Sequence, residues 1–264
     1  MIALKNASVM FNQGTVNENQ ALSTINLNVA EGDFITIIGS NGAGKSTLFN
    51  LIAGTITPTS GSIHVNDRNV TRDPEYKRAR YIGRIFQNPL LGTASNMSLE
   101  DNMMITYRKG FKWLKRSLNS AMREFFRSEL VHLKMGLEHR MKENMVMFSG
   151  GQRQALTLLM MVLSKPSLIM LDEHTAALDP KNAEIVLDLT NRFISEHRLT
   201  SMMITHNMSH AIEYGNRLLM MDRGEIIFDV SGDAKKELTV EKLIEKFHEL
   251  RHHGFGNDRA LLSE

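Results

Sequence analysis

The stretch that decides the fold is Gly39-Ser40-Asn41-Gly42-Ala43-Gly44-Lys45-Ser46-Thr47, which fits the pattern G-x-x-x-x-G-K-[ST]. It follows a short apolar run, Phe34 to Ile38, and precedes a stretch of helical character, Lys45 to Ala53. Strand, glycine loop and helix in this order predict a loop whose backbone N–H groups surround phosphate. Lys45 would face the β- and γ-phosphates, and the Ser46 hydroxyl would bind Mg²⁺. A Rossmann loop is excluded, because the last glycine of G-x-G-x-x-G is missing.

A second informative stretch is the acidic end of an apolar run, Leu168-Ile169-Met170-Leu171-Asp172-Glu173. Further apolar runs at 201–204 and 218–221 are separated by helix-length segments, a pattern typical of strands buried on both faces of a parallel sheet. Ligands bind at the carboxyl ends of such strands. We therefore predict that Asp172 completes the Mg²⁺ shell opposite Ser46, and that Glu173 orients or deprotonates the attacking water. The alternative is an acidic strand end that caps the next helix.

The segment from Asn88 to Met147 differs in composition from the rest of the chain. It has few strand patterns, and helix-forming and charged residues dominate. Ser98-Leu99-Glu100-Asp101 resembles a capping box at a helix start. Between Asp101 and Arg140 there are nine Lys or Arg residues against four acids. We predict an inserted helical subdomain, whose basic residues form either a solvated face or a partner surface.

Composition restricts the function classes. The chain has 264 residues, 42% of them hydrophobic, which suggests one large domain or two unequal ones. A net charge of +2 is not that of a strongly basic polyanion binder, so no nucleic-acid partner is expected. The absence of cysteine fits a reducing compartment. The longest apolar stretch, Ala155 to Leu163, is too short to span a membrane, and the N-terminus does not read as a signal peptide. We therefore expect a cytoplasmic location.

A signature-like motif identifies the family that the chain resembles. Phe148-Ser149-Gly150-Gly151-Gln152 resembles the signature of ATP-binding cassette (ABC) ATPases, usually Leu-Ser-Gly-Gly-Gln. The phosphate loop corresponds to Walker A and Leu171-Asp172-Glu173 to Walker B. Gln87 resembles the Q-loop glutamine, and His206 the H-switch. The motifs stand in family order, and the resemblance covers residues 2–230.

The resemblance implies an α/β fold: a P-loop NTPase with a mainly parallel central sheet, an N-terminal antiparallel β subdomain and an inserted helical subdomain. The expected domains are 1–87 and 148–230 for the two parts of the nucleotide-binding core, 88–147 for the helical signature subdomain, and 231–264 for a C-terminal helix and tail.

The resemblance also implies a site for ATP and Mg²⁺ in which two cassettes face head to tail. The signature helix would contact the γ-phosphate on the other subunit, and Phe11 would stack on adenine, unless it is an ordinary core residue at a strand end. The implied catalytic residues are Glu173, His206 and Gln87, and the implied metal ligands are Ser46, Gln87 and Asp172. The implied nucleotide-binding residues are Phe11, Ser40, Asn41, Gly42, Ala43, Gly44, Lys45, Ser46, Thr47, Ser149, Gly150, Gly151 and Gln152.

Two residues depart from the family pattern. His174 stands where the family usually has proline, and Phe148 replaces the usual leucine. His174 would titrate near neutrality if exposed, although a tolerated loop variant is the favoured interpretation. The methionines at 160, 161, 202, 203, 220 and 221 are interpreted as core packing.

The class of cassette follows from what the chain lacks. Ser149 follows Gln87 by only 62 positions, no spanning segment is fused, and the Gly-Glu-Arg-Gly element of many exporters is missing. This is similar to importer ATPases, with a weaker likeness to systems for aromatic amino acids. The alternatives are a soluble ABC ATPase acting on nucleic acid or ribosomes, and an unrelated P-loop kinase.

The expected partners are transmembrane permease subunits, a second copy of the chain and an extracytoplasmic substrate-binding protein, with the ATPase peripheral to the cytoplasmic face of the membrane. The segment from Asn88 to Met147 is expected to dock on the permease. Its apolar contacts would come from Phe111, Trp113, Leu114 and Leu118, and its cationic contacts from Lys109, Lys112, Lys115 and Arg116.

Overall fold

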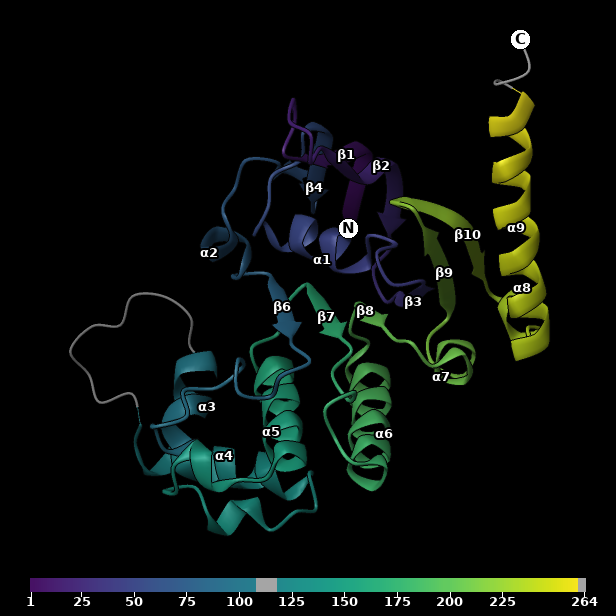
Figure 1. Ribbon diagram of the computed structural model, residues 1–264. Coiled ribbons are helices and arrows are strands. Elements are labelled where there is room, and N and C mark those ends of the chain that lie inside the picture. Colours follow the sequence, from purple (N-terminus) through teal and green to yellow (C-terminus); the bar gives the residue numbers. More distant parts are fainter. Residues whose placement is uncertain (108–117, 261–264) are drawn as a thin grey trace. The chain divides into compact units, whose positions relative to one another are not determined.

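The computed structural model describes residues 1–107 and 118–260, with side chains through residue 250. The chain forms two compact units (Figure 1). The first unit is Met1–Pro74 together with Met202–Glu264, and the second unit is Glu75–Ser201.

The first unit contains an antiparallel sheet with strand order β2-β1-β4-β5. Its strands are β1 (Ile2–Phe11), β2 (Asn19–Val29), β4 (Ser60–Val65) and β5 (Arg68–Asn69). Alternating residues of β1 and β2 are buried, as the period of a half-exposed strand requires. The predicted N-terminal antiparallel β subdomain is thereby confirmed.

The strand that leads into the phosphate loop lies among mainly parallel strands. In the first unit the order is β10-β9-β3-β8, with β3 parallel to β9 and β9 antiparallel to β10. These strands are β3 (Phe34–Gly39), β8 (Ser201–Ile204), β9 (Arg217–Asp222) and β10 (Glu225–Ser231). All residues of β3 before Gly39 are buried, which is why its sequence is a continuous apolar run without alternation.

Four helices complete the first unit: α1 (Lys45–Ala53), α7 (Met208–Glu213), α8 (Asp233–Lys236) and α9 (Val240–Ala260). Leu243 of α9 packs into a core cluster with Ala211 of α7 and Leu218 of β9. The buried Lys235 donates hydrogen bonds to the carbonyls of Ile212, Tyr214 and Gly215 at 2.5–2.9 Å. This side chain satisfies carbonyls at the end of α7 and fixes α8 to them.

The second unit contains the predicted helices between residues 88 and 147. They are α3 (Leu99–Tyr107), α4 (Ser120–Val131) and the 3₁₀ turns η1 (Leu137–His139) and η2 (Met145–Met147). The N-cap half of the predicted capping box is present, because Ser98 Oγ accepts a hydrogen bond from the Asp101 N–H at 3.2 Å. The Asp101 carboxylate accepts a hydrogen bond from the Ser98 hydroxyl.

The rest of the second unit is a parallel strand pair with helices. Strand β6 (Ile82–Ile85) pairs in parallel with β7 (Leu168–Asp172). The helices are α2 (Glu75–Arg78), α5 (Gly150–Leu163) and α6 (Pro180–His197), and α5 and α6 lie side by side (Figure 1). The α/β class with mainly parallel strands and inserted helices is confirmed.

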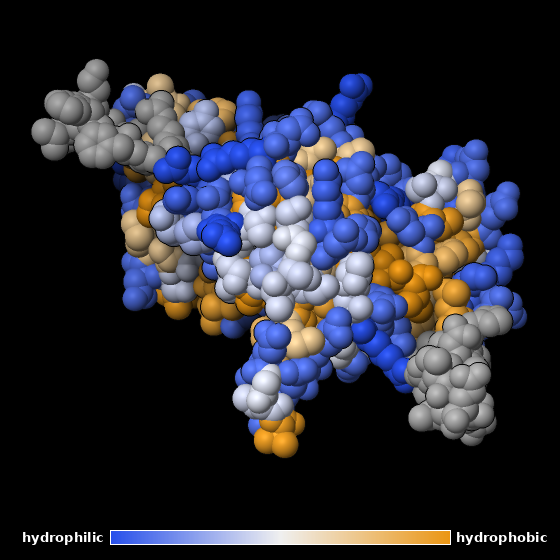
Figure 2. All heavy atoms as spheres, turned by 90° about the horizontal axis from the view of Figure 1, so that it is seen from above, coloured by the Kyte–Doolittle hydropathy of each residue, from blue (hydrophilic) through white to orange (hydrophobic). Residues whose placement is uncertain are grey.

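The methionines occupy core positions, as predicted. Those at 160, 202, 203, 220 and 221 are buried, and Met161 is partly buried. Met161 packs directly on Gly83 of β6, where any side chain would collide with its sulfur. None of the described helices is long and apolar enough to cross a membrane. The face drawn in Figure 2 is mostly hydrophilic, with hydrophobic side chains in separate patches.

Candidate nucleotide-binding site

The phosphate loop of the first unit requires two of its glycines for steric reasons. A Cβ at Gly39, the last residue of β3, would collide with the carbonyl oxygen of Met221 on the neighbouring strand. Gly44 is the N-cap of α1 with φ 95°, and a Cβ there would lie 2.7 Å from the carbonyl oxygen of Ala21. Only glycine adopts this backbone without strain and also fits the space.

The side chains of the loop make hydrogen bonds within the loop and to the end of β9. Lys45 is buried at the start of α1, and its Nζ donates to the carbonyls of Gly39 at 2.7 Å and Ser40 at 3.0 Å. Ser40 Oγ donates to the Asp222 carboxylate at 2.9 Å, which fixes the loop to the end of β9. Ala43 is buried, whereas Asn41, Gly42 and Ser46 are exposed. The loop therefore holds its cation internally and presents its open face to solvent.

His206 lies beside this loop. It is exposed after the end of β8, and it lines a cavity of about 150 Å³ together with Gly39, Ser40 and Phe247. Phe11, at the end of β1, is 39% exposed. The alternative of a buried core phenylalanine is therefore wrong, and the ring is accessible to a planar ligand.

The carboxylate pair ends strand β7 in the second unit. Arg84 of β6 donates from Nη2 to Asp172 Oδ2 at 2.6 Å, and its guanidinium lies 4.9 Å from the centroid of the Phe86 ring. Glu173 is half-buried and has φ 47°, in the left-handed region. Such a backbone costs a non-glycine residue about 1 kcal/mol or more, so the turn at Glu173 is held by its surroundings.

Gln154 of α5 supplies part of that support. This residue is buried, and its Nε2 donates to the carbonyls of Phe86 at 3.1 Å and His174 at 2.7 Å. Phe86 precedes Gln87, which is exposed, and His174 follows Glu173. One amide therefore links the helix of the signature motif to the residues beside Gln87 and Glu173.

Ser149 and Gln152 form a capping box at the start of α5. Ser149 Oγ accepts from the Gln152 N–H at 3.3 Å, and Gln152 Oε1 accepts from the Ser149 N–H at 3.1 Å. A Cβ at Gly151 would lie 3.0 Å from Asn182 of α6, which explains the small residue there. Ser149 is exposed, so the positive end of α5 opens to solvent.

His174 is buried, which contradicts its possible titration near neutrality as an exposed residue. Its Nε2 lies 3.1 Å from Thr190 Oγ1 on α6. Thr190 Oγ1 donates its own proton to the Val186 carbonyl, so it accepts the Nε2–H of a neutral imidazole. Burial lowers the pKa of His174 to about 4, because the charged form would lose its hydration.

The family-implied metal ligands are chemically suited to Mg²⁺. Ser46, Asp172 and Gln87 offer hydroxyl, carboxylate and amide oxygens, the donors that this hard cation prefers. Among residues 1–107 and 118–250, no cluster of three His, Asp or Glu side chains forms a separate metal centre.

Sequence reasoning missed Arg84 and Gln154. Arg84 carried a signal, because a cation inside the short apolar run Ile82 to Ile85 requires a carboxylate partner. Gln154 carried none, since polar residues are frequent in amphipathic helices.

Comparisons with known proteins agree with this geometry. Residues 22–176 match the ABC transporter family. The chain is 40% identical to a tyrosine transport ATP-binding protein of Clostridioides difficile, covering 94% of this chain and 98% of that one. It is 30% identical to a phosphonates import ATP-binding protein of Halalkalibacterium halodurans, covering 92% and 93%.

A solved structure shows the same fold with nucleotide products bound. This is the dimeric, post-hydrolysis state of an ATP-binding cassette with ADP and Pi, which matches at a TM-score of 0.72 and 27% identity over 88% of this chain and 98% of that one. This chain is thus an ATPase that belongs to the ABC transporter family.

Proposed function

We propose that this chain hydrolyses ATP to power uptake of a solute through a separate membrane permease, at the cytoplasmic face of the membrane. The observation that carries the proposal is the 40% identity to a tyrosine transport ATP-binding protein over nearly the full length of both chains. The same relative favours an aromatic amino acid as the solute, delivered by an extracytoplasmic binding protein. The similarity to a phosphonates import protein supports the direction of transport.

Each site residue has a role in this proposal. Residues 40–47 bind the phosphates through backbone N–H groups and Lys45, and Phe11 stacks on the adenine ring. Ser46, Asp172 and Gln87 hold Mg²⁺, which neutralises charge on the β- and γ-phosphates when bound. Glu173 accepts a proton from the attacking water, and His206 contacts the γ-phosphate. Arg84 fixes the Asp172 carboxylate by the ion pair at 2.6 Å.

The active form in this proposal is a head-to-tail dimer with two composite sites. The N–H groups at the start of α5, with Ser149, Gly150, Gly151 and Gln152, bind the γ-phosphate held by the other subunit. The exposure of Ser149 supports such a contact.

A mixing experiment tests the dimer. Ser149→Arg and Lys45→Ala should each abolish hydrolysis as homodimers. An equal mixture should restore about a quarter of wild-type activity, because half of the dimers are mixed and each has one intact site. Normal hydrolysis by both single variants would overturn the head-to-tail arrangement.

The permease docks on residues 88–147 in this proposal. Among described residues, seven of the twelve exposed large hydrophobic side chains belong to this segment: Leu90, Leu91, Met97, Ile105, Val131, Val146 and Met147. Exposed apolar groups of this kind favour a protein partner. Of the residues expected to form the contact, Leu118 is partly buried. Phe111, Trp113, Leu114, Lys109, Lys112, Lys115 and Arg116 lie outside the described residues.

Purification of the tagged chain from gently solubilised membranes tests the partnership. A membrane permease and a binding protein should copurify, and a charge-reversed Lys112, Lys115 and Arg116 variant should recover less permease at unchanged basal ATPase activity. Copurification of ribosomes or nucleic acid in place of a permease would overturn the transport proposal in favour of the soluble alternative.

A further inference from the structure

Residues 140–148, which end on the first residue of the signature motif, form a segment whose two ends contact each other, here called the signature strap. Its first residue, Arg140, places its guanidinium carbon 4.5 Å from the centroid of the Phe148 ring, the last residue of the strap. Phe148 is almost completely buried, at 2% exposure. The cation therefore lies against a buried ring, a geometry in which cation–π attraction is effective.

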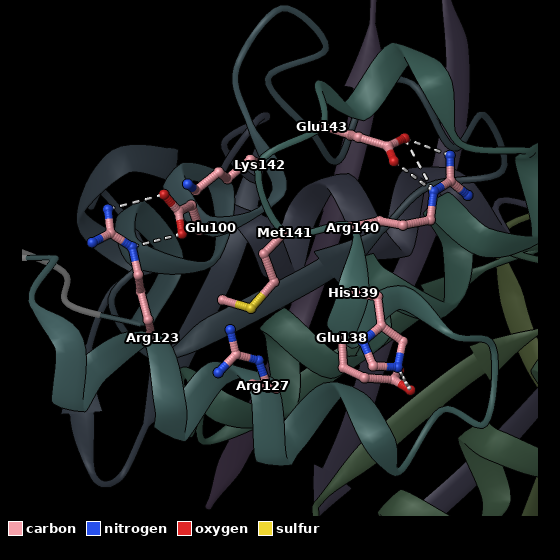
Figure 3. A pocket seen from close by; sticks show the side chains of 9 residues that line it. All are labelled: Glu100, Arg123, Arg127, Glu138, His139, Arg140, Met141, Lys142 and Glu143. Carbon is pink, nitrogen blue, oxygen red and sulfur yellow. Dashed lines mark hydrogen bonds and ion pairs between the residues drawn. The ribbon is translucent and has the colours of Figure 1, made fainter.

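Arg140 uses the edge of its guanidinium for a second partner. Its Nε lies 3.0 Å from both carboxylate oxygens of Glu143, and its Nη2 lies 2.6 Å from Glu143 Oε2. Figure 3 shows this pair on one side of a cavity of about 420 Å³. These hydrogen bonds hold the pKa of Glu143 below its ordinary value. The guanidinium thus bonds Glu143 through its edge while its face stacks on the Phe148 ring. The ammonium of a lysine is not planar and cannot make both contacts in this way.

Both flanks of the strap are fixed by backbone hydrogen bonds. The N–H groups of Leu99 and Glu100, at the start of α3, donate to the carbonyls of Glu143 and Met141, each at 2.9 Å. In the other direction the Met145 N–H donates to the Met97 carbonyl at 3.0 Å. At the end of the strap, Arg153 Nε donates to the Phe148 carbonyl at 2.8 Å. The Phe148 side chain is buried, and Arg140 is the charged group that stacks on its ring.

We propose that Arg140 is a positioning residue for the signature motif: by stacking on Phe148 it sets the place of Ser149, one peptide bond further on. The inference rests on the proposed function, in which Ser149 acts at the γ-phosphate. It also explains why this chain departs from the usual leucine at position 148, because leucine has no π face on which an arginine can stack. Arg140 and Phe148 act as a pair.

A double-mutant cycle tests the pair. Arg140→Ala should lower kcat for ATP about three- to tenfold, the range of a partly exposed cation–π contact. The KM for ATP should change less than about twofold, because the ground-state contacts lie in the phosphate loop. In a Phe148→Leu background, the same substitution should change kcat less than about twofold. If Arg140→Ala does not fold, Arg140→Lys completes the cycle, since it keeps the charge and loses the stacking plane.

A matched control comes from α6, where the Arg192 guanidinium carbon lies 5.2 Å from the centroid of the Phe193 ring. Arg192→Ala removes a similar contact away from the signature motif and should leave kcat unchanged. Equal losses from Arg140→Ala in the wild-type and Phe148→Leu backgrounds, or no loss in either, would overturn the proposal. Ser149→Arg, assayed in the same series, distinguishes a failure of the Arg140 inference from a failure of the proposed function. If it is inactive while the cycle shows no coupling, only the role of Arg140 is wrong, and if it hydrolyses normally, the proposed role of the signature motif is wrong.

Discussion

The burial of His174 predicts a specific loss of stability in mild acid. The pKa of this side chain is about 4 in the folded protein, against an ordinary value of 6.5. Between these two values the unfolded chain binds a proton that the folded protein does not. Stability therefore rises with pH across this window and is lost as the pH falls from about 6.5 toward about 4.

The magnitude follows from the difference in pKa. Each pKa unit corresponds to about 1.4 kcal/mol, so the full effect is about 3 kcal/mol below both values. At about pH 5 the unfolded histidine is almost fully protonated and the folded one almost fully neutral, so about 2 kcal/mol should already be lost. This is a large share of the stability of an ordinary domain.

Urea unfolding followed by circular dichroism at about pH 7.5 and pH 5 measures this loss. His174→Gln keeps an N–H donor for Thr190 Oγ1 but cannot be protonated, so its free energy of unfolding should fall about 2 kcal/mol less than that of the wild type between the two pH values. The exposed His132 provides the control, and His132→Gln should retain the wild-type pH dependence. If His174→Gln loses as much stability in acid as the wild type, the inferred neutral, buried histidine is wrong.

Three further predictions concern the ATP site. Glu173→Gln should keep ATP binding but reduce steady-state turnover by about 100-fold or more, because the proton acceptor for water is removed; near-normal hydrolysis would contradict its role. Lys45→Ala should weaken Mg-ATP binding at least about tenfold in calorimetry, since the lost charge faces the phosphates in the ground state too; unchanged affinity would contradict the loop assignment. Gln154→Leu should destabilise the fold by about 1–3 kcal/mol by removing the donor to two carbonyls, and should lower kcat more than ATP affinity, while an unaffected kcat would limit Gln154 to a structural role.

Local rules were sufficient for most of the fold. One local pattern joins the apolar run before Gly39, the glycine loop and the following helix. A buried parallel strand needs a crossover helix, and the tight turn between strand and helix accepts few residue types. The N-cap at Ser98 was equally predictable, since both partners lie within one helical turn. The candidate site residues are predicted from motifs of the same local kind, and their roles stay predictions.

Contacts between residues distant in sequence were not readable. Arg84 meets Asp172 across 88 positions, and Gln154 reaches Phe86 across 68. Such pairs depend on the register between β6 and β7 and on how α5 lies against them, and one sequence does not specify either. The burial of His174 was not predictable either, because nothing in the neighbouring sequence shows that its ring enters the core beside α6.

The two departures from the family pattern have a common physical reason. Proline after the catalytic glutamate would fix its own backbone without help from other side chains. Here Glu173 has a left-handed backbone, and the next residue is held instead by two contacts, its ring on Thr190 and its carbonyl on the Gln154 amide. Phe148 similarly relies on Arg140. In both places, a tertiary contact replaces a conformational preference that the family builds into a single residue. The turn after Glu173 thereby becomes sensitive to pH through His174, and the signature motif depends on an arginine outside it.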